Sequence, residues 1–407
     1  MTPLLLNSFE VKTAHEILGA LSDCLRDIDP SDPFLAGGCA GLALAHAALH
    51  EVLPGGGHDA LAMTALERAI AILGSTVSTP ALFNGFSGVA WAVELLCGDS
   101  SMPAADDPNT DVDATLEELL DESSYEGPYD LLDGLAGLGV YALERMPRLS
   151  AKRTLELIVK RLADMSEPQE QGIAWRSRRE WIPEKFRPAQ IPEWNLGVAH
   201  GVPGVIGLLG RVTAAEVGTP TVETARALLS KAVSWLLAQD SREAFAYYLG
   251  SGVDSEPARL GWCYGDPGIA SMLVVAGQAA REPRWTAEGI RIGLRACERP
   301  LRSAGVKDAG LCHGAAGLAH IFHRLYSATG RGEFRDASRC WLGELFTMRR
   351  EQGGCAGYLA YGPDSEGIVA WRADAGFLTG AVGITLALSA ALTDLEPVWD
   401  RALMLSG

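Results

Sequence analysis

The stretch Gly38-Cys39-Ala40-Gly41-Leu42-Ala43-Leu44-Ala45-His46-Ala47-Ala48-Leu49 sets the pattern for the whole chain. It places a Gly-x-x-Gly step in front of about ten small or apolar residues. The same pattern recurs at steps of 47, 49, 67, 64, 49 and 66 residues. Periods of this size indicate a repeat architecture. The seven copies begin at Gly38, Gly85, Gly134, Gly201, Gly265, Gly314 and Gly380.

Each copy predicts a helix that has no polar face, which is typical of a helix buried on all sides. More amphipathic helices are expected between the copies, because apolar residues recur there at helical spacing. The clearest of these lie at 9–28, 151–165, 222–238, 284–298 and 332–350. Strand-like alternation of apolar and polar residues is scarce.

Seven buried helices alternating with seven amphipathic ones favour two concentric layers. The expected fold is all-α, an (α/α)7 toroid with seven inner and seven outer helices, and it makes residues 1–407 a single domain. A linear helical solenoid is the rival, but it exposes one flank of its helices along a groove. The uniformly apolar inner helices disfavour that arrangement.

The longer repeat steps contain insertions. Residues 166–199 are rich in Trp, Arg, Pro and Glu, break the helical periodicity and end just before His200. Long segments of this kind are often functional, so we expect an irregular insertion near the active-site mouth. Residues 351–376, with many glycines, are a second candidate.

Composition excludes several classes of partner. The formal net charge is −17 and no Lys/Arg-rich run appears, which argues against nucleic acid as a partner. The chain shows neither a signal peptide nor an apolar stretch long enough to span a membrane, so a cytoplasmic protein is expected. In that compartment the eight cysteines should remain thiols. Cys24, Cys97, Cys297 and Cys340 fall in helical patterns and should be small buried residues.

Two of the glycine steps follow metal-ligating residues. Cys263 precedes Gly265 by two residues, and Cys312-His313 directly precedes Gly314. Two thiols and one imidazole make a zinc site with its fourth position open, as in catalytic rather than structural zinc sites. Taken singly, each of the three residues would be read as a buried structural one, but their equivalent placement favours the metal.

Other chemically capable residues occupy related positions when the copies are aligned. His200 and Tyr264 fall one residue before the first glycine of their copies, as His313 does. Asp130 lies four residues before Gly134, and Arg259 six before Gly265. In a toroid these positions meet at one end of the ring, where helix N-termini favour thiolates and anions.

Each of these residues also has an alternative, purely structural role. Asp133 shares the slot of His200 and competes with Asp130 as the active-site carboxylate. It could instead cap the following helix, and the Tyr129-Asp130 match favours Asp130. His200 is otherwise a core histidine, and Arg259 a surface ion-pair partner. The remaining histidines match no motif position and should be structural or solvated: His15, His46, His50, His58, His320 and His323.

The constellation closely resembles the LanC family, the lanthionine cyclases of lanthipeptide antibiotic biosynthesis. The strings that carry the resemblance are Tyr129-Asp130, Asn195-Leu196-Gly197-Val198-Ala199-His200-Gly201-Val202-Pro203-Gly204, Arg259-x-x-Trp262-Cys263-Tyr264-Gly265-Asp266-Pro267-Gly268 and Cys312-His313-Gly314. These strings stand in the family's order, and the resemblance extends over all seven repeats.

The resemblance implies a zinc enzyme that adds peptide cysteine thiols to dehydroalanine or dehydrobutyrine in a dehydrated precursor peptide. By motif position it implies Cys263, Cys312 and His313 as zinc ligands. Asp130, His200, Arg259 and Tyr264 match the family's other active-site positions, and a lanthipeptide dehydratase is a plausible partner. His200, held by Asp130, is the expected proton donor. Arg259 either orients Asp130 or steadies developing charge, and Tyr264 positions either a zinc ligand or the enolate oxygen.

Three other functions compete with this one. A LanC-like protein that adds glutathione to dehydroamino acids would share the fold and the zinc. A prenyltransferase subunit or a glycosidase would share the toroid. The former can also use zinc, but usually with a carboxylate ligand, and the latter needs a facing pair of carboxylates. A peptide-binding scaffold without activity would not need the intact ligand set.

Overall fold

The computed structural model describes residues 1–406 except 5, 104, 122–124, 185–186, 188–189, 251–255 and 365. Lys185, one of the basic residues of the 166–199 insertion, lies outside the described residues. Over the described part the chain forms fourteen α-helices and three two-stranded antiparallel sheets. None of the helices found there is both long and apolar enough to cross a bilayer.

Each of the seven Gly-x-x-Gly copies starts a helix, and its first glycine is the N-cap. These inner helices are buried almost throughout; in α14, for example, every residue from Ala381 to Ala390 is buried. The seven are α2 (Cys39–Val52), α4 (Phe86–Cys97), α6 (Leu135–Glu144), α8 (Val202–Ala214), α10 (Asp266–Ala279), α12 (Ala315–Thr329) and α14 (Ala381–Leu392).

The helices between them bury one stripe, as the apolar spacing predicts. In α1 the buried residues include Ile17, Leu18, Leu21 and Leu25. The other outer helices follow the predicted ranges to within three residues where a range was given. The seven are α1 (Ser8–Arg26), α3 (His58–Leu73), α5 (Thr110–Asp121), α7 (Leu149–Met165), α9 (Thr219–Ala238), α11 (Pro283–Glu298) and α13 (Gly332–Thr347).

The backbone contacts divide the chain into two compact units, each built from separate stretches of sequence. The first comprises Met1–Val77, Arg259–Trp262 and Gly293–Trp399; the second comprises Ser78–Ala258, Cys263–Ile292 and Asp400–Gly407. That residues 1–407 form one domain stays a prediction.

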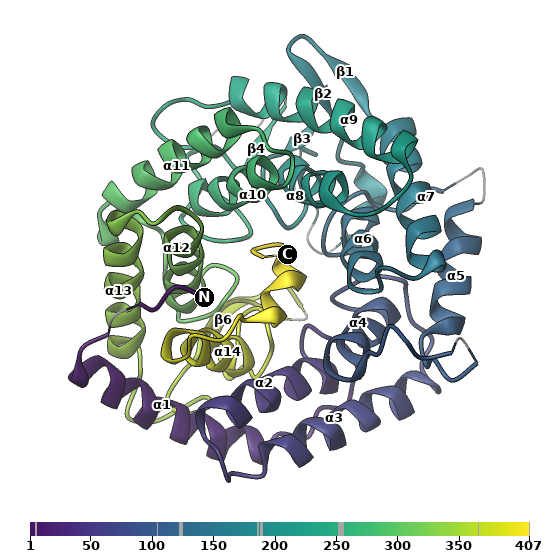
Figure 1. Cartoon of the computed structure of the whole chain (residues 1–407). Coiled ribbons are helices and arrows are strands. Elements are labelled where there is room, and N and C mark those ends of the chain that lie inside the picture. The colour runs from purple at the N-terminus through teal and green to yellow at the C-terminus, as the bar shows by residue number, and fades with distance from the viewer. Residues whose placement is uncertain are drawn as a thin grey trace. The chain divides into compact units, whose positions relative to one another are not determined.

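Within the first unit, α14 packs between the inner helices α12 and α2, while α13, α1 and α3 pack outside them (Figure 1). Within the second unit, α8 packs between α6 and α10, and α6 in turn contacts α4 (Figure 1). The outer helices α5, α7 and α9 follow one another along that row. Both units therefore repeat the same pairing of a buried helix with an amphipathic one.

Short strands occupy the insertions. Residues 166–199 contain β1 (Glu167–Gln169), β2 (Gly172–Ala174), a 3-10 turn at Arg179–Trp181 and β3 (Trp194–Asn195). Strand β3 pairs with β4 (Tyr248–Leu249), with Asn195 opposite Tyr248. Strands β5 (Ala360–Pro363) and β6 (Val369–Arg372) form a hairpin in the 351–376 segment.

The expectation that all eight cysteines are thiols is wrong. Cys24 on α1 and Cys355 are joined by a disulfide within the first unit. Cys97, the last residue of α4, and Cys340 on α13 are exposed rather than buried. Cys297 is half-buried.

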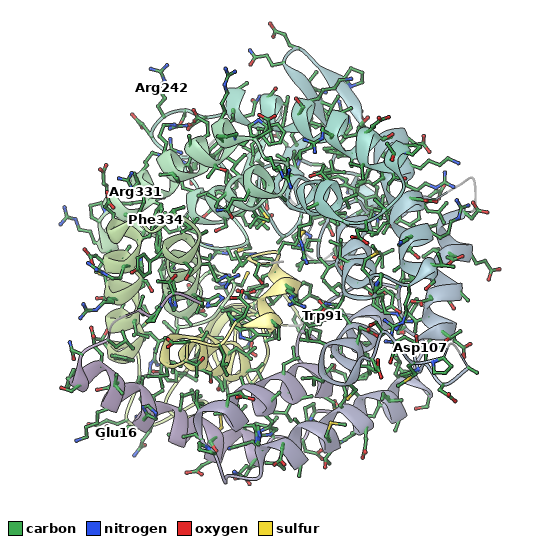
Figure 2. The ribbon with its side chains drawn as sticks, viewed as in Figure 1. Glu16, Trp91, Asp107, Arg242, Arg331 and Phe334 are labelled. Carbon is green, nitrogen blue, oxygen red and sulfur yellow. A yellow bond between two sulfur atoms is a disulfide. The ribbon has the colours of Figure 1, made fainter. Side chains whose placement is uncertain are left out.

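A buried cluster of charged side chains holds the C-terminal end of α6 in the second unit. Arg145, the C-cap of α6, is 1% exposed and its guanidinium lies 2.7 Å from a carboxylate oxygen of Glu94 and of Asp107, and 2.6 Å from one of Asp113. Arg148 makes further bonds to Glu94 and Asp107. Figure 2 labels Asp107 among the side chains of this region.

Candidate metal centre

The glycines at the start of the inner helices are needed for close backbone approach. A Cβ atom on the second glycine of a step would overlap the carbonyl oxygen six residues earlier, as at Gly204 and Val198 or Gly317 and Leu311. Gly265 also has a φ of +93°, which favours glycine. The turns are therefore tight enough to aim the residues before them off the helix end.

Neighbouring turns are tied together by backbone hydrogen bonds. In the first unit Phe377 N donates to Ala36 O at 2.7 Å, and Cys312 N donates to Leu378 O at 2.6 Å. Trp262 N donates to Cys312 O at 2.8 Å. These bonds bring the turn that precedes α10 against the turn that precedes α12.

The second unit continues the same arrangement. Ala199 N donates to Cys263 O at 3.5 Å, Leu131 N to Ala199 O at 3.1 Å, and Leu132 N to the same oxygen at 3.3 Å. Phe83 N donates to Leu132 O at 3.5 Å. Nearly all of these bonds use the residue two positions before the first glycine of a copy.

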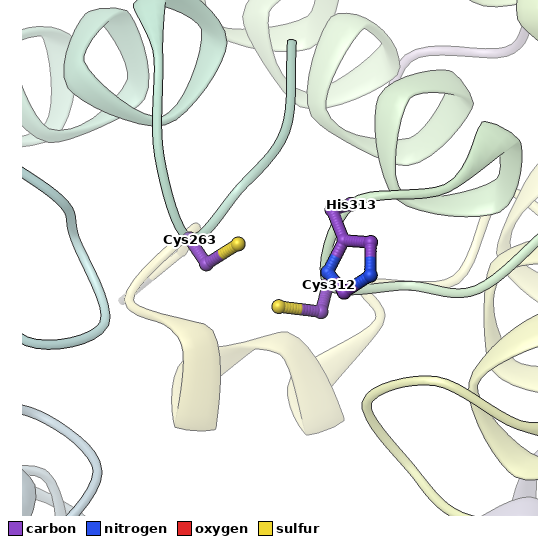
Figure 3. A group of neighbouring side chains, drawn as sticks. All are labelled: Cys263, Cys312 and His313. Carbon is purple, nitrogen blue, oxygen red and sulfur yellow. The ribbon is translucent and has the colours of Figure 1, made fainter. Parts of the chain in front are cut away.

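The predicted metal ligands come together through this backbone arrangement. Trp262 donates a backbone hydrogen bond to Cys312. Because Cys263 directly follows Trp262, it lies close to Cys312 as well. One ligand atom from each of Cys263, Cys312 and His313 lies within 4.8 Å of the others (Figure 3). Cys263 is buried, and the other two are half-buried.

The donor set fits zinc. Two sulfur ligands at about 2.3 Å from a tetrahedral zinc lie about 3.8 Å apart, and the three donor atoms here lie within 4.8 Å of one another. Two thiolates and one imidazole leave a fourth position for a substrate atom. The three residues can therefore hold a zinc ion in an open site.

A carboxylate–imidazole pair lies in the second unit with Cys263. Asp130 Oδ2 is 2.7 Å from His200 Nδ1, and the Asp133 backbone N–H donates to Asp130 Oδ1 at 2.8 Å. With both its oxygens engaged, the buried Asp130 carboxylate is held in one orientation. Its bond to Nδ1 leaves Nε2 as the nitrogen that can exchange a proton with a substrate.

The electrostatics of this pair favour a charged imidazole. Burial works against the charge on His200, but the Asp130 carboxylate, with smaller contributions from Asp133 and Cys263, raises the pKa of His200 to about 9. The pKa of Asp133 is also raised, by desolvation of its carboxyl and by the nearby Asp130 charge.

Asp133 belongs to this group rather than to the helix terminus. The N-cap of α6 is Gly134, with no side-chain capping bond. Asp133 instead offers a carboxylate oxygen within 4.8 Å of donor atoms of Asp130 and His200. The carboxylate that pairs with His200 is therefore that of Asp130, and Asp133 lies beside the pair without capping α6.

Tyr264 is held by residues that sequence reasoning did not assign to the site. Asn195 Nδ2 donates to the Tyr264 hydroxyl at 3.1 Å, and the Tyr248 hydroxyl is 3.0 Å from it. Burial and the Tyr248 hydroxyl raise the pKa of Tyr264 well above its usual value, so it is a neutral phenol. Asn195 belongs to the string before His200, whereas no sequence signal marks Tyr248.

Arg259 belongs to the first unit, where the next residue, Leu260, donates its backbone N–H to Ala304 O at 2.8 Å. Its predicted role toward Asp130 or the substrate stays a prediction. The histidines outside the motifs are elsewhere: His46 and His58 bond to each other at 3.1 Å, and His323 lies 2.8 Å from Thr2 O.

Comparison with known proteins agrees with this geometry. The chain matches the model of the lanthionine synthetase C-like protein family over residues 29–404. It is 25% identical over 339 residues to the Danio rerio protein named glutathione S-transferase LANCL1, covering 77% of this chain and 75% of that one. The structure resembles nisin cyclase with a TM-score of 0.72 and 20% identity over 97% of each chain, which confirms the predicted (α/α)7 fold class. The chain therefore belongs to the lanthionine synthetase C-like family.

Proposed function

We propose that this protein is a zinc-dependent lanthionine and methyllanthionine cyclase. Its substrate is a dehydrated precursor peptide, in which cysteine thiols add to dehydroalanine or dehydrobutyrine. The observation that carries the proposal is the Asp130–His200 pair at 2.7 Å in the same unit as Cys263, whose charge acts on His200. A proton carrier and a metal ligand therefore lie within electrostatic reach of each other.

Cys263, Cys312 and His313 would hold the zinc ion. When bound, it would lower the pKa of a substrate thiol and so supply a thiolate at neutral pH. The new C–S bond forms at the alkene β-carbon while the π electrons move to the carbonyl, giving an enolate. The α-carbon then takes up one proton, so the thiol has added across the double bond without a leaving group.

His200 is the proposed source of that proton. Its pKa of about 9 keeps the imidazole protonated at neutral pH, and Asp130 fixes the ring through Nδ1. Nε2 then presents the proton to the α-carbon. Tyr264, neutral and held by Asn195 and Tyr248, is a positioning residue next to Cys263.

The first test separates metal from chemistry. Purified protein should contain about one zinc per chain by anaerobic metal analysis, and Cys312→Ala should lose both the zinc and ring formation. Ring formation leaves the peptide mass unchanged, so it is measured as loss of alkylatable thiols by mass spectrometry. Cys340→Ser, at an exposed cysteine, is the matched control and should keep both.

The second test isolates the proton carrier. Asp130→Asn and His200→Ala should keep the zinc and lose most of the ring-forming rate, while His15→Ala on α1 changes neither. A His200→Ala enzyme that closes rings at the wild-type rate would exclude His200 as the proton source.

A second function is favoured by one comparison. The Danio rerio relative is named a glutathione S-transferase. Addition of glutathione to a dehydroamino acid would form the same kind of C–S bond, but the thiol would come from glutathione and not from the peptide. Two incubations distinguish the functions. In the first, a cysteine-containing dehydrated precursor is incubated in the absence of glutathione; in the second, a cysteine-free dehydrated precursor is incubated in its presence. We expect reaction only in the first. The dehydratase partner and cytoplasmic location also remain proposals.

A further inference from the structure

A pocket of about 420 Å³ opens within the second unit beside the 166–199 insertion. It lies between the turn of the β1–β2 hairpin, strands β3 and β4, and the C-terminal end of α9. Figure 1 shows the hairpin beside α9, and β2 contacts that helix. The pocket is distinct from the group of Asp130, His200 and Cys263, none of which lines it.

Two tryptophans form the aromatic wall of this pocket. Trp194 is 8% exposed and Trp235 is 4% exposed, and their rings meet edge to face with centroids 5.9 Å apart. Within the described part of the chain, neither indole N–H has a hydrogen-bond partner. Neither N–H is among the buried polar atoms left without a partner, so both are open to solvent and can donate to carbonyl oxygens of a ligand in the pocket.

The charge of the lining favours a cation. Glu170 and Glu193 line the pocket, and no Lys or Arg does so among the described residues. The C-terminal end of α9 adds negative partial charge. Carboxylates beside an indole face are a setting that binds ammonium and guanidinium groups.

The molecule already contains one example of such a contact at the edge of the pocket. The guanidinium of Arg176 lies 4.6 Å from the ring centroid of Trp194 and bonds to Glu193 at 2.9 Å and Glu167 at 3.0 Å. Counting Glu167, Glu170 and Glu193 against Arg176, the region keeps two negative charges.

Strand β3 links this pocket to the candidate metal centre. Successive side chains of a strand point to opposite faces. Trp194 lines the pocket, while the next side chain, Asn195, donates to Tyr264, which directly follows Cys263. The pocket wall and the residue that holds Tyr264 are therefore consecutive residues of one strand.

We propose that this pocket binds a lysine or arginine side chain of the substrate peptide, at a residue outside the ring being closed. The flanking carbonyl oxygens of that extended segment accept from the indoles of Trp194 and Trp235. The assignment of the occupant as substrate rests on the proposed cyclase function. The pocket itself is defined by charge and geometry alone.

The first experiment measures binding without turnover. Protein labelled with 5-fluorotryptophan is titrated with acetyl-Gly-Gly-Lys-Gly-Gly-amide and followed by fluorine NMR, with the two resonances assigned from Trp194→Phe and Trp235→Phe. We expect both to shift with the lysine peptide and not with peptides carrying glutamate or norleucine. Equal shifts with norleucine, or none with lysine, would overturn the proposal.

Charge reversal supplies the matched control. Glu170 is exposed on the hairpin turn and Glu223 is exposed on the first half of α9, away from the pocket. Glu170→Lys should weaken binding of the lysine peptide about fivefold or more, and Glu223→Lys should leave it unchanged. Equal effects of the two would show only a long-range field and refute the site.

The second experiment connects the pocket to the reaction. With a lysine-containing dehydrated precursor, Glu170→Lys and Trp235→Phe should raise KM and leave kcat unchanged. Trp285→Phe, on α11, should alter neither. Binding of the pentapeptide without any ring formation would refute the cyclase and keep the pocket. Ring formation with no fluorine shift and no change in KM would refute the pocket and keep the cyclase.

Discussion

Replacing Arg145 by methionine should destabilise the second unit markedly. The guanidinium is 1% exposed and bonds to Glu94, Asp107 and Asp113. Methionine keeps the volume but leaves buried carboxylates short of one cation. Removing one partner of a buried ion pair costs about 3–5 kcal/mol. Arg148 still pairs with two of the three acids, so the lower end, about 3 kcal/mol, is expected.

The size of the thermal shift reports how much of the chain unfolds with the cluster. At roughly 2.1 cal/mol/K per residue, 3 kcal/mol lowers the midpoint by about 3.5 °C if all 407 residues unfold together. The shift is about 7 °C if only about half the chain unfolds in that step. Calorimetry gives both the midpoint and the enthalpy, which distinguishes the two cases.

A matched arginine controls for loss of surface charge. Arg153 on α7 is 49% exposed by its side chain and pairs with Asp121 at 3.3 Å. Exposed pairs contribute about 0–1 kcal/mol, so Arg153→Met should shift the midpoint by about a third of the Arg145→Met shift or less. If the Arg145 and Arg153 variants melted together, the buried cluster would not stabilise the protein as argued.

Three further outcomes are expected. Burial lowers the pKa of His323 to about 4, below the unfolded value of about 6.5. The neutral imidazole therefore stabilises the fold fully above pH 6.5, and this stabilisation is lost as the pH falls toward 4. In thermal melts, the stability lost between pH 7.5 and pH 5 should be up to about 2 kcal/mol smaller in His323→Gln than in wild type. Gly317→Ala should disrupt the turn before α12 and lose zinc, because the added Cβ meets the Leu311 carbonyl oxygen. Gly343→Ala, which has open space around it inside α13, should instead raise the melting midpoint. A Gly317→Ala protein that retains zinc would contradict the turn argument. Thiol titration of denatured protein should find two fewer groups without reductant than with it, and Cys24→Ser should abolish that difference.

The sequence predicts the inner layer well, because its signal is local and repeated. Every first glycine of a copy is an N-cap, and the outer helix α1 begins and ends within two residues of the predicted 9–28. The grouping of Cys263, Cys312 and His313 was also predictable, since residues at equivalent positions of a closed repeat meet.

Contacts that depend on tertiary packing were not predictable. The disulfide joins cysteines 331 residues apart, and no local pattern pairs them. Tyr248 reaches Tyr264 only because β4 pairs with β3 in one register. Side-chain periodicity likewise gives no information on which carboxylates surround Arg145.

The backbone bonds between neighbouring turns have a consequence for how this fold diversifies. Since main-chain atoms fix the turns, the side chain just before each first glycine can vary without altering the scaffold. This chain carries Gly37, Asn84, Asp133, His200, Tyr264, His313 and Thr379 at that position. The fold thus offers seven equivalent positions that can be substituted independently, and new chemistry can arise by changing single residues there. Gly37, Asn84 and Thr379 are the natural sites at which a designer would add a ligand or an acid.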